Sequence, residues 1–196
     1  MLLDYDEIIK KYNIKLTGVI HVGGHVGEEI PLYKKQTNNI HIFEPLEECF
    51  NRIDPSVNRY NVALGSKQQI LPFNVADNHQ SSSFLKPKTH LQEHTWVQFY
   101  EGQRMIQINT LDSYNITDCN LLNLDVQGYE LEVLNGGMQT LSSIDYIFTE
   151  INEKELYENC AQLKQLDAFL FDFTREEIVM TDHGWGDAFY IRKNKI

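Results

Sequence analysis

The chain has 196 residues, which is enough for one α/β domain and short for two, so we expect a single domain over residues 1–196. Hydrophobic residues make up 42% and charged residues 23%, a balance that argues against disorder and supplies enough apolar side chains for a core. The formal net charge of −11 repels a polyanion, so nucleic acid is not expected as a substrate.

The cysteines and the first residues bear on the compartment. Cys49, Cys119 and Cys160 are scattered and lack C-x-x-C spacing, which argues against a disulfide framework or a zinc knuckle and favours a reducing compartment. Residues 1–7 show no basic region followed by an apolar core, and no apolar run approaches the roughly 18 residues of a membrane span. We therefore expect a cytoplasmic protein that does not associate with membranes.

The first predicted element is a short amphipathic helix at Asp4–Asn13, within an N-terminal cap over residues 1–16. An apolar strand then begins at Val19 and runs into a turn rich in glycine that ends at Gly27. A second apolar strand, Ile40–Glu44, ends in a carboxylate about 20 residues after the first glycine, a separation that suits the two hydroxyls of a ribose. Together these two strands predict a nucleotide site.

The glycines of this turn indicate which nucleotide fits. Gly23, Gly24 and Gly27 remove Cβ atoms where the backbone turns sharply, and they let a ligand lie against the main chain. His25 stands where a G-x-G-x-x-G dinucleotide turn would have a spaced glycine, and no Lys-Ser/Thr pair of a phosphate loop follows. A ligand with a ribose but no phosphate, such as S-adenosylmethionine, fits better than a dinucleotide. An ordinary tight turn is the structural alternative.

The middle of the chain first continues the alternation of strands and helices and then interrupts it. Helices are predicted at Glu28–Lys35 and Leu46–Ile53. Tyr60–Leu64 is predicted as a third strand and Gln69–Val75 as its antiparallel partner. The polar segment Asp77–Lys88, with three adjacent serines, is typical of a loop, either a functional one or a solvated linker.

The second half predicts the centre of the sheet and its far edge. Asn120–Val126 is expected to be a buried central strand with Asp125 near its end. The other predicted elements are the strands Met105–Leu111, Tyr146–Ile151, about Phe171–Val179 and Asp187–Arg192, and the helices Gln127–Leu141 and Glu153–Ala168. We expect a Rossmann-like α/β fold with a mainly parallel central sheet, helices on both faces and an antiparallel C-terminal strand.

Several polar residues follow different predicted strands. In an open parallel sheet, ligands bind outside the carboxyl ends of the strands. The glycine turn, Glu44, the loop after Leu64, Asp125 and Glu150 are therefore expected to be neighbours. A carboxylate after a strand is also a common helix N-cap, and this remains the alternative role of Asp125.

The stretch Leu121–Gly137 is Leu-Leu-Asn-Leu-Asp-Val-Gln-Gly-Tyr-Glu-Leu-Glu-Val-Leu-Asn-Gly-Gly. It resembles the signature of the FkbM-type methyltransferases, an apolar strand followed by Lys-x-Asp-x-(Glu or Gln)-Gly-x-Glu and a helix ending in Leu-x-Gly. The resemblance extends over about residues 17–192 through further stretches in the family's order, which are His21–Gly27, Phe43–Pro45, Asn61–Gly65, Ser81–Ser83, Thr110–Asp112 and Glu150–Asn152.

The resemblance implies a class I methyltransferase fold and methyl transfer from S-adenosylmethionine to a hydroxyl of a sugar or another small molecule. By position, the glycine turn would pass the methionine part, Glu44 would bind the ribose hydroxyls and Asn61–Ala63 would flank the adenine. Two residues depart from the family pattern: His21 replaces the usual Asp, and Asn123 stands where Lys is frequent. The expected cofactor-binding residues are His21, Gly23, Gly24, Gly27, Glu44, Pro45, Asn61, Val62, Ala63, Ser82 and Asp125.

Methyl transfer is an in-line displacement, so positioning contributes most and a base need only take the hydroxyl proton. The candidate catalytic residues are Asp125, Glu150 and His183. Asp125 and Glu150 also offer oxygen ligands for a divalent metal that would lower the pKa of the hydroxyl. Metal use is not favoured, because the sequence has no dense cluster of Asp and His.

Two other classes of function remain open. Glu44 would also suit a nicotinamide-dependent oxidoreductase, although the dinucleotide fingerprint is missing. A binding protein that keeps the fold without activity is the second alternative. The sequence does not name the acceptor, since loop aromatics such as Trp96 and Trp185 serve equally for stacking on a sugar and for local packing.

Overall fold

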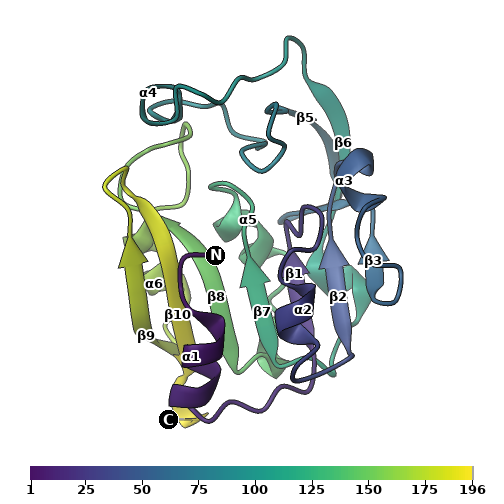
Figure 1. Cartoon of the computed structure of the whole chain (residues 1–196), viewed down its shortest axis with the longest axis vertical. Helices are drawn as coiled ribbons and strands as arrows, with labels where there is room; N and C mark the ends of the chain where they lie inside the picture. Colours follow the sequence, from purple (N-terminus) through teal and green to yellow (C-terminus); the bar gives the residue numbers. More distant parts are fainter. Residues whose placement is uncertain (196) are drawn as a thin grey trace.

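A seven-stranded sheet runs through the protein in the computed structural model, which describes residues 1–195 (Figure 1). The strand order is β3-β2-β1-β7-β8-β10-β9, and neighbouring strands are parallel except where β10 pairs with β8 and β9. These strands are β1 (Val19–Val22), β2 (Ile40–Phe43), β3 (Asn58–Tyr60), β7 (Leu121–Leu124), β8 (Tyr146–Asn152), β9 (Phe173–Met180) and β10 (Trp185–Arg192). The predicted mainly parallel sheet with an antiparallel C-terminal strand is confirmed.

Helices cover both faces of this sheet: α1 and α2 lie in front of it in Figure 1, and α5 and α6 lie behind it. The α-helices are α1 (Tyr5–Lys11), α2 (Ile30–Tyr33), α3 (Glu47–Phe50), α4 (His90–Glu93), α5 (Glu130–Asn135) and α6 (Leu163–Phe169). Three 3-10 helices are η1 (Leu111–Tyr114), η2 (Thr140–Ser143) and η3 (Lys193–Lys195). In the described part of the chain, no helix combines the length and the apolar composition that crossing a bilayer requires.

The pleat of the central strands explains the two helical layers. Val19 of β1 and Leu121 of β7 belong to the core formed with α1 and α2. Their chain neighbours Ile20 and Leu122 belong to the core formed with α5 and α6. Successive side chains of a strand point to opposite faces, so strands that are apolar throughout must be covered on both sides.

A smaller sheet corrects the prediction for the third strand. Tyr60–Leu64 is not one strand, because β3 ends at Tyr60 and β4 (Ala63–Leu64) belongs to a second sheet in the order β4-β6-β5. Between them, the Asn61 side chain donates hydrogen bonds to the carbonyl oxygens of Glu44 and Pro45 and fixes the point where the chain leaves the main sheet. The antiparallel partner of β5 (Gln69–Phe73) is β6 (Arg104–Asn109), not the third strand.

The helix predicted over Gln127–Leu141 is also divided. Gln127 and Gly128 have φ values of 55° and 92°, in the left-handed region that a right-handed helix does not use, so α5 begins only at Glu130. After α5, a Cβ on Gly136 would lie 2.0 Å from the carbonyl oxygen of Gly65. Gly136 therefore permits a close approach to Gly65, which follows β4, and the chain continues into η2.

The helix predicted over Glu153–Ala168 begins ten residues too early, since α6 starts at Leu163. The preceding residues pair with the loop after β5: the Leu156 carbonyl accepts a hydrogen bond of 2.7 Å from the Lys88 backbone N–H. Tyr157 is buried beneath that loop with 1% exposure. Backbone partners from a distant segment replace the local hydrogen bonds of a helix here.

The segment between β5 and β6 arches over the carboxyl ends of the central strands (Figure 1). It includes the predicted loop Asp77–Lys88, which contains no helix, and α4, one turn of helix that the sequence did not predict. The molecule therefore has a main sheet between two helical layers, a smaller second sheet and a segment that covers one end.

Gly23, directly after β1, tests how closely the central turns approach. Its φ is 82°, and an added Cβ would lie 1.8 Å from the carbonyl oxygen of Asp125. We predict that Gly23→Ala lowers the free energy of unfolding by about 2–5 kcal/mol, because left-handed backbone costs alanine about 1–2 kcal/mol and the overlap adds about 1–3 kcal/mol. Urea denaturation measures this loss.

Gly102 provides the matched control. It has the same φ of 82°, and nothing lies within 4 Å of its added Cβ, so Gly102→Ala should show the backbone cost alone. Equal losses in the two variants would mean that the contact with Asp125 does not constrain the turn.

Candidate active site

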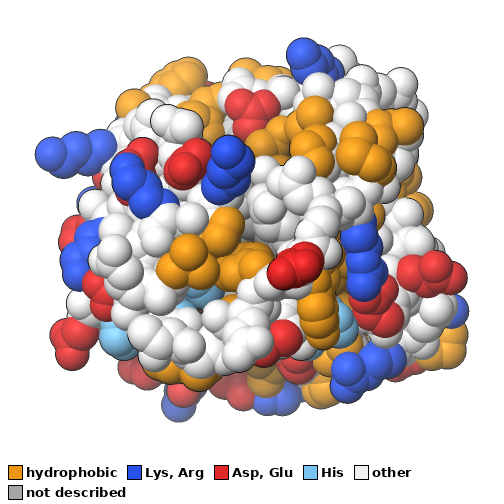
Figure 2. Space-filling model, turned by 90° about the horizontal axis from the view of Figure 1, so that it is seen from above, with side chains coloured by type: hydrophobic (Ala, Val, Ile, Leu, Met, Phe, Trp, Pro, Cys, Tyr) orange, Lys and Arg blue, Asp and Glu red, His pale blue; other side chains and the backbone are white. Residues whose placement is uncertain are grey.

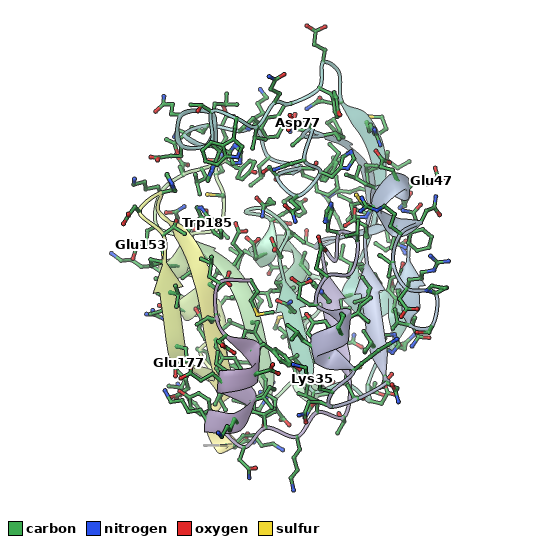
Figure 3. The ribbon with its side chains drawn as sticks, in the orientation of Figure 1. Lys35, Glu47, Asp77, Glu153, Glu177 and Trp185 are labelled. Carbon is green, nitrogen blue, oxygen red and sulfur yellow. The ribbon has the colours of Figure 1, made fainter. Side chains whose placement is uncertain are left out.

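A cavity of about 540 Å³ lies between the carboxyl ends of β1, β2 and β7 and the segment that arches over them. Figure 3 places Trp185, which lines the cavity, at the same end of the molecule as Asp77, and Lys35 and Glu177 at the opposite end. Figure 2 looks onto this covered end, where hydrophobic patches alternate with charged side chains and histidine atoms show between them.

The cavity is acidic. Among the described residues that line it there is no Lys or Arg. Its carboxylate-bearing residues are Glu28, Glu29, Glu44, Asp125, Glu150 and Asp187. Low-dielectric walls strengthen the field of these groups, so the cavity attracts cations and repels anions.

Glu44 follows β2 and is held by two backbone donors. Its Oε2 accepts a hydrogen bond of 2.9 Å from the His25 N–H, and its Oε1 accepts one of 2.8 Å from the Leu46 N–H. A carboxylate has about four lone-pair positions, so each oxygen keeps one for a further donor. Only 6% of the residue is exposed, and burial raises the pKa of the Glu44 carboxyl to about 7.

Asp125 and Glu150 lie after β7 and in β8, and Gln127 connects them. The Gln127 amide Nε2 donates hydrogen bonds of 2.8 Å to Asp125 Oδ1 and 2.6 Å to Glu150 Oε2. The Tyr157 hydroxyl lies 2.8 Å from the Ser81 carbonyl oxygen and 3.1 Å from Gln127 Oε1, and these two acceptors share its single hydrogen. The Gln127 amide, which donates to both acids, is thus held in place by Tyr157 and the loop that contains Ser81.

Two more acids, Glu130 and Asp187, lie near Asp125 and Glu150. Burial, followed by the charge of Asp125, raises the pKa of the Glu150 carboxyl well above its ordinary value. Glu130, at the start of α5, is fully buried, and burial raises its pKa to about 7 although its Oε1 accepts the Val126 and Gly128 N–H groups. Asp187 is the cross-strand partner of Glu150, and burial raises its pKa too. Burial therefore favours the protonated forms of Glu130, Glu150 and Asp187 more than it would for exposed carboxyls.

His21 lies beneath the glycine turn in a neutral polar cluster. It is the register partner of Asn123 across β1 and β7. The Tyr33 hydroxyl of α2 accepts a hydrogen bond of 2.7 Å from Asn123 Nδ2 and lies 3.3 Å from His21 Nδ1. Burial lowers the pKa of His21, so the ring is uncharged. His21 and Asn123 are therefore both uncharged.

The far wall of the cavity is aromatic. It includes His90, His94, Trp96, Tyr157 and Trp185. Burial lowers the pKa of His90 to about 4, so its ring is neutral. In the described part of the chain, His90 Nδ1 and the indole Nε1 of Trp185 are buried without a hydrogen-bond partner. Rings and free polar atoms of this kind suit an organic ligand with hydroxyl groups.

The structure brings most of the predicted site residues together. Those that line the cavity are His21, Gly23, Gly24, Glu44, Pro45, Val62, Ala63, Ser82, Asp125 and Glu150. Gly27, Asn61 and His183 are not among the lining residues. A Cβ on Gly27 would lie 2.5 Å from Ile30 Cδ1, and the Asn61 side chain donates to the Glu44 carbonyl oxygen. The His183 ring pairs with Glu93 at 2.8 Å on the outside of the aromatic wall.

Four residues of the site were not predicted: Gln127, Glu130, Tyr157 and Asp187. Gln127 and Glu130 stand in the Asp-x-Gln-Gly-x-Glu stretch that begins at Asp125, so that spacing was an available signal. Tyr157 was missed because the sequence predicted a helix over Glu153–Ala168, which includes it. Asp187 begins an apolar strand and has no signal of its own, because its role depends on pairing with β8.

The fold and the acidic cavity at the carboxyl edge define a class I methyltransferase architecture. The structure is similar to a methyltransferase FkbM from Methylobacillus flagellatus KT, with a TM-score of 0.57, 12% identity, and coverage of 89% of this chain and 43% of that one. It is also similar to an S-adenosylmethionine-dependent methyltransferase from Aquifex aeolicus, with a TM-score of 0.52, 12% identity, and coverage of 97% and 90%.

Residues 21–180 match the model of the methyltransferase FkbM domain, and the chain belongs to this family. A relative named 2-O-methyltransferase NoeI, from Sinorhizobium fredii (strain NBRC 101917 / NGR234), is 36% identical over 90 residues. That match covers 44% of this chain and 37% of NoeI. The chain thus spans less than half of NoeI and of the Methylobacillus protein.

The charge state of Glu44 should be visible in stability. Its pKa is about 7 in the folded chain, against about 4.3 unfolded, so the folded state binds the extra proton between these values and stability falls as pH rises through them. Because Glu44→Gln cannot ionise, wild type should lose about 2 kcal/mol relative to this variant between about pH 5.5 and about pH 8. Urea denaturation at both pH values measures the difference. A difference that does not change with pH would mean that Glu44 keeps one charge state throughout.

Proposed function

We propose that the protein is an S-adenosylmethionine-dependent O-methyltransferase whose acceptor is a hydroxyl of a small molecule or a sugar. The observation that carries this proposal is one acidic cavity with Glu44 at the end of β2, the Asp125 and Glu150 pair at the ends of β7 and β8, and an aromatic wall beyond them. A cation with a ribose and an uncharged hydroxylated acceptor match these three parts.

The cofactor half of the cavity fits S-adenosylmethionine by charge and by hydrogen bonding. The described lining residues include carboxylates and no Lys or Arg, which suits a sulfonium cation. Glu44 keeps free lone pairs on both oxygens for a ribose diol, and its backbone donors fix the carboxylate in place. When bound, S-adenosylmethionine supplies a methyl group that is electrophilic because it is attached to a positive sulfur.

The acceptor half provides a proton acceptor. Asp125 and Glu150 share the Gln127 amide, and the raised pKa of Glu150 means that this pair takes up a proton readily. One of its carboxylate oxygens would accept the hydrogen of the acceptor hydroxyl and hold that oxygen for in-line attack. Gln127 keeps the two acids at fixed positions while the proton moves.

A metal between Asp125 and Glu150 fits the geometry less well. The Gln127 amide already donates to both carboxylates, from the position that a cation shared by the two acids would take. Binding a metal there would require Gln127 to leave, together with its bond from Tyr157. Proton transfer to the pair needs no such rearrangement.

Two observations support the proposed class of acceptor: the aromatic wall of the cavity and the name of one relative. His90 and Trp185 offer buried polar atoms beside aromatic rings, the combination that binds hydroxylated rings. NoeI is named a 2-O-methyltransferase, which supports a hydroxyl as the acceptor here. A nicotinamide dinucleotide is disfavoured, since its pyrophosphate would meet the carboxylates of the cavity.

Glu44 should determine cofactor affinity. Charge-assisted hydrogen bonds are worth about 1.5–3 kcal/mol, so we predict that Glu44→Ala weakens binding of S-adenosylmethionine by more than about tenfold in calorimetry. Glu47→Ala is the control, because Glu47 is exposed on the adjacent helix α3 and does not line the cavity. Both variants are checked by thermal melting. An unchanged dissociation constant for the folded Glu44→Ala protein would remove Glu44 from the cofactor site.

Asp125→Asn tests the acceptor half. Asparagine keeps the oxygen that accepts from Gln127 and loses the negative charge, so binding of S-adenosylmethionine should stay near normal while turnover falls by about a hundredfold or more. Turnover is followed as S-adenosylhomocysteine formed with a panel of sugars and other hydroxylated acceptors. The exposed Asp172→Asn serves as the control. Turnover within a few-fold of wild type would leave Asp125 a structural role, and a wild type inactive on the whole panel would favour a binding protein.

A further inference from the structure

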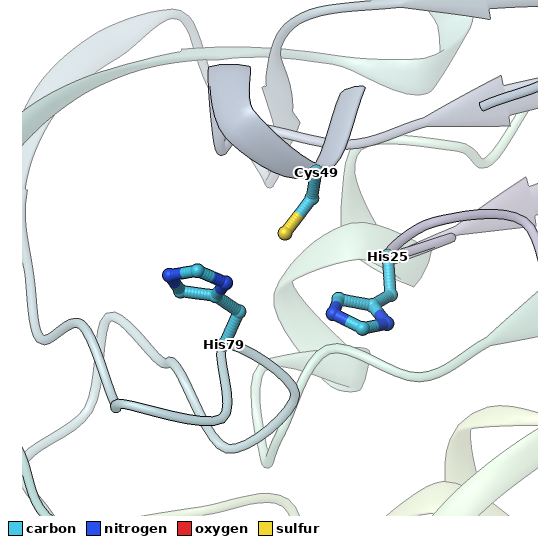
Figure 4. Close-up of side chains that lie close together, drawn as sticks. All are labelled: His25, Cys49 and His79. Carbon is cyan, nitrogen blue, oxygen red and sulfur yellow. The ribbon is translucent and has the colours of Figure 1, made fainter. Parts of the chain in front are cut away.

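Three side chains from distant parts of the sequence meet beside the cofactor half of the cavity. His25 belongs to the glycine turn after β1, Cys49 to α3, and His79 to the loop after β5. Each offers one ligand atom, and these atoms lie within 4.8 Å of one another. Figure 4 shows the two imidazole rings and the thiol facing the same space between their three elements. Neither the methyl-transfer chemistry nor the predicted site uses this group.

Both histidines have a carboxylate at one ring nitrogen. His25 Nδ1 lies 2.8 Å from Glu28 Oε1, and His79 Nε2 lies 3.6 Å from Glu48 Oε1. Histidine ligands of metals usually donate their second N–H to a carboxylate in this way, which orients the ring and leaves the other nitrogen for the ion. Glu28 lies within hydrogen-bonding distance of His25 and orients its ring, whereas Glu48 lies at ion-pair distance from His79.

Cys49 differs from the other two cysteines in the state of its sulfur. Within residues 1–195, Cys49 Sγ makes no hydrogen bond, whereas Cys119 Sγ accepts one of 3.6 Å from Asn39 and Cys160 Sγ one of 3.3 Å from Gln162. Cys49 is fully buried, so its sulfur is shielded from bulk solvent and faces the two histidines. A thiol in that position is available as a ligand.

A second group of metal-binding residue types lies close together but has no free histidine nitrogen for a metal. His41, Asp118 and Cys119 also have ligand atoms that lie within 4.8 Å of one another. Both nitrogens of His41 are already engaged, with Tyr60 at 3.0 Å and Asn39 at 3.1 Å, and its ring stacks on Tyr60. His41 is therefore a satisfied structural histidine, and the cluster has no free nitrogen to offer.

The backbone of the first group carries a further sign of function. His25 and His79 have φ values of 45° and 59°, in the left-handed region that residues other than glycine seldom occupy. Residues held in such conformations cluster at ligand sites, where the surrounding structure holds them in place. Here the conformation turns both rings toward Cys49 (Figure 4).

We propose that His25, Cys49 and His79 form a binding site for a borderline-soft divalent cation of the Zn²⁺ type. Two imidazoles and one thiolate are ligands that Zn²⁺ prefers over the oxygen-binding Mg²⁺ and Ca²⁺. The S–H bond breaks as the sulfur–metal bond forms, and the proton passes to water that the hydrated ion brings in through the cavity that His25 and His79 line. Three protein ligands leave the fourth tetrahedral position for water or a further oxygen donor.

The bound cation would join the turn after β1, α3 and the loop after β5. The His25 N–H donates to Glu44, and the loop of His79 continues into the serines that line the cavity. The cation would therefore hold that loop down beside the cofactor half of the cavity. The effect on the cavity rests on the proposed function, because that function names the ligand of the cavity. The cation site itself does not rest on the proposed function.

The experiment is a titration of the full chain with Co²⁺ and Zn²⁺ after treatment with a chelator. Co²⁺ bound to a thiolate gives a sulfur-to-cobalt charge-transfer absorption, and added Zn²⁺ should displace it. We expect this absorption in wild type, its loss in Cys49→Ser, and an affinity at least about a hundredfold weaker in His79→Gln. Cys119→Ser and Cys160→Ser are matched controls that should keep the signal. Glu28→Gln, behind His25, should weaken binding by about 10–100-fold.

Each outcome decides the proposal. Absence of the charge-transfer band in wild type, or its loss in Cys119→Ser rather than Cys49→Ser, would overturn the assignment. His79→Gln serves if Cys49→Ser fails to fold, since His79 lies in a loop and is partly exposed. Normal Co²⁺ affinity in a folded His79→Gln protein would also overturn it. Calorimetry with S-adenosylmethionine runs separately, so failure of the cation site and failure of the methyltransferase proposal are distinguishable.

Discussion

The carbonyl oxygen of Asp125 lies where a side chain at position 23 would have to be. An added Cβ would approach it to 1.8 Å, so only glycine lets the turn after β1 touch the turn after β7. These strands are parallel neighbours, and the contact sets how their ends lie side by side. The position of Asp125 relative to the glycine turn, and so the join between the two halves of the cavity, depends on this contact.

The second constraint is the concentration of buried acids at this edge. Backbone N–H groups hold Glu44 and Glu130, and the Gln127 amide holds Asp125 and Glu150. These bonds offset only part of the cost of burying negative charge, which is why the pKa values of Glu44, Glu130 and Glu150 are raised. A cation entering the cavity would favour the ionised acids again. The edge is therefore matched to a positive ligand, the property that a sulfonium cofactor requires.

Two departures from the family pattern lie next to each other in the sheet. His21 and Asn123 replace the usual Asp and the frequent Lys, and the structure makes them register partners across β1 and β7. The paired exchange leaves two neutral groups joined through the Tyr33 hydroxyl, with all three side chains buried.

The sequence by itself determined the parallel sheet, its antiparallel strand and the grouping of Glu44, Asp125 and Glu150 at one edge, because apolar strands and the polar residues that end them are local patterns. It misplaced the helices around Gln127 and Tyr157. There, left-handed backbone and hydrogen bonds to a distant loop override the local helical pattern. Only the tertiary structure showed that His25, Cys49 and His79 converge or that Gln127 bridges two acids. Such contacts depend on where three or four separate segments finally pack, and no spacing along the chain encodes that.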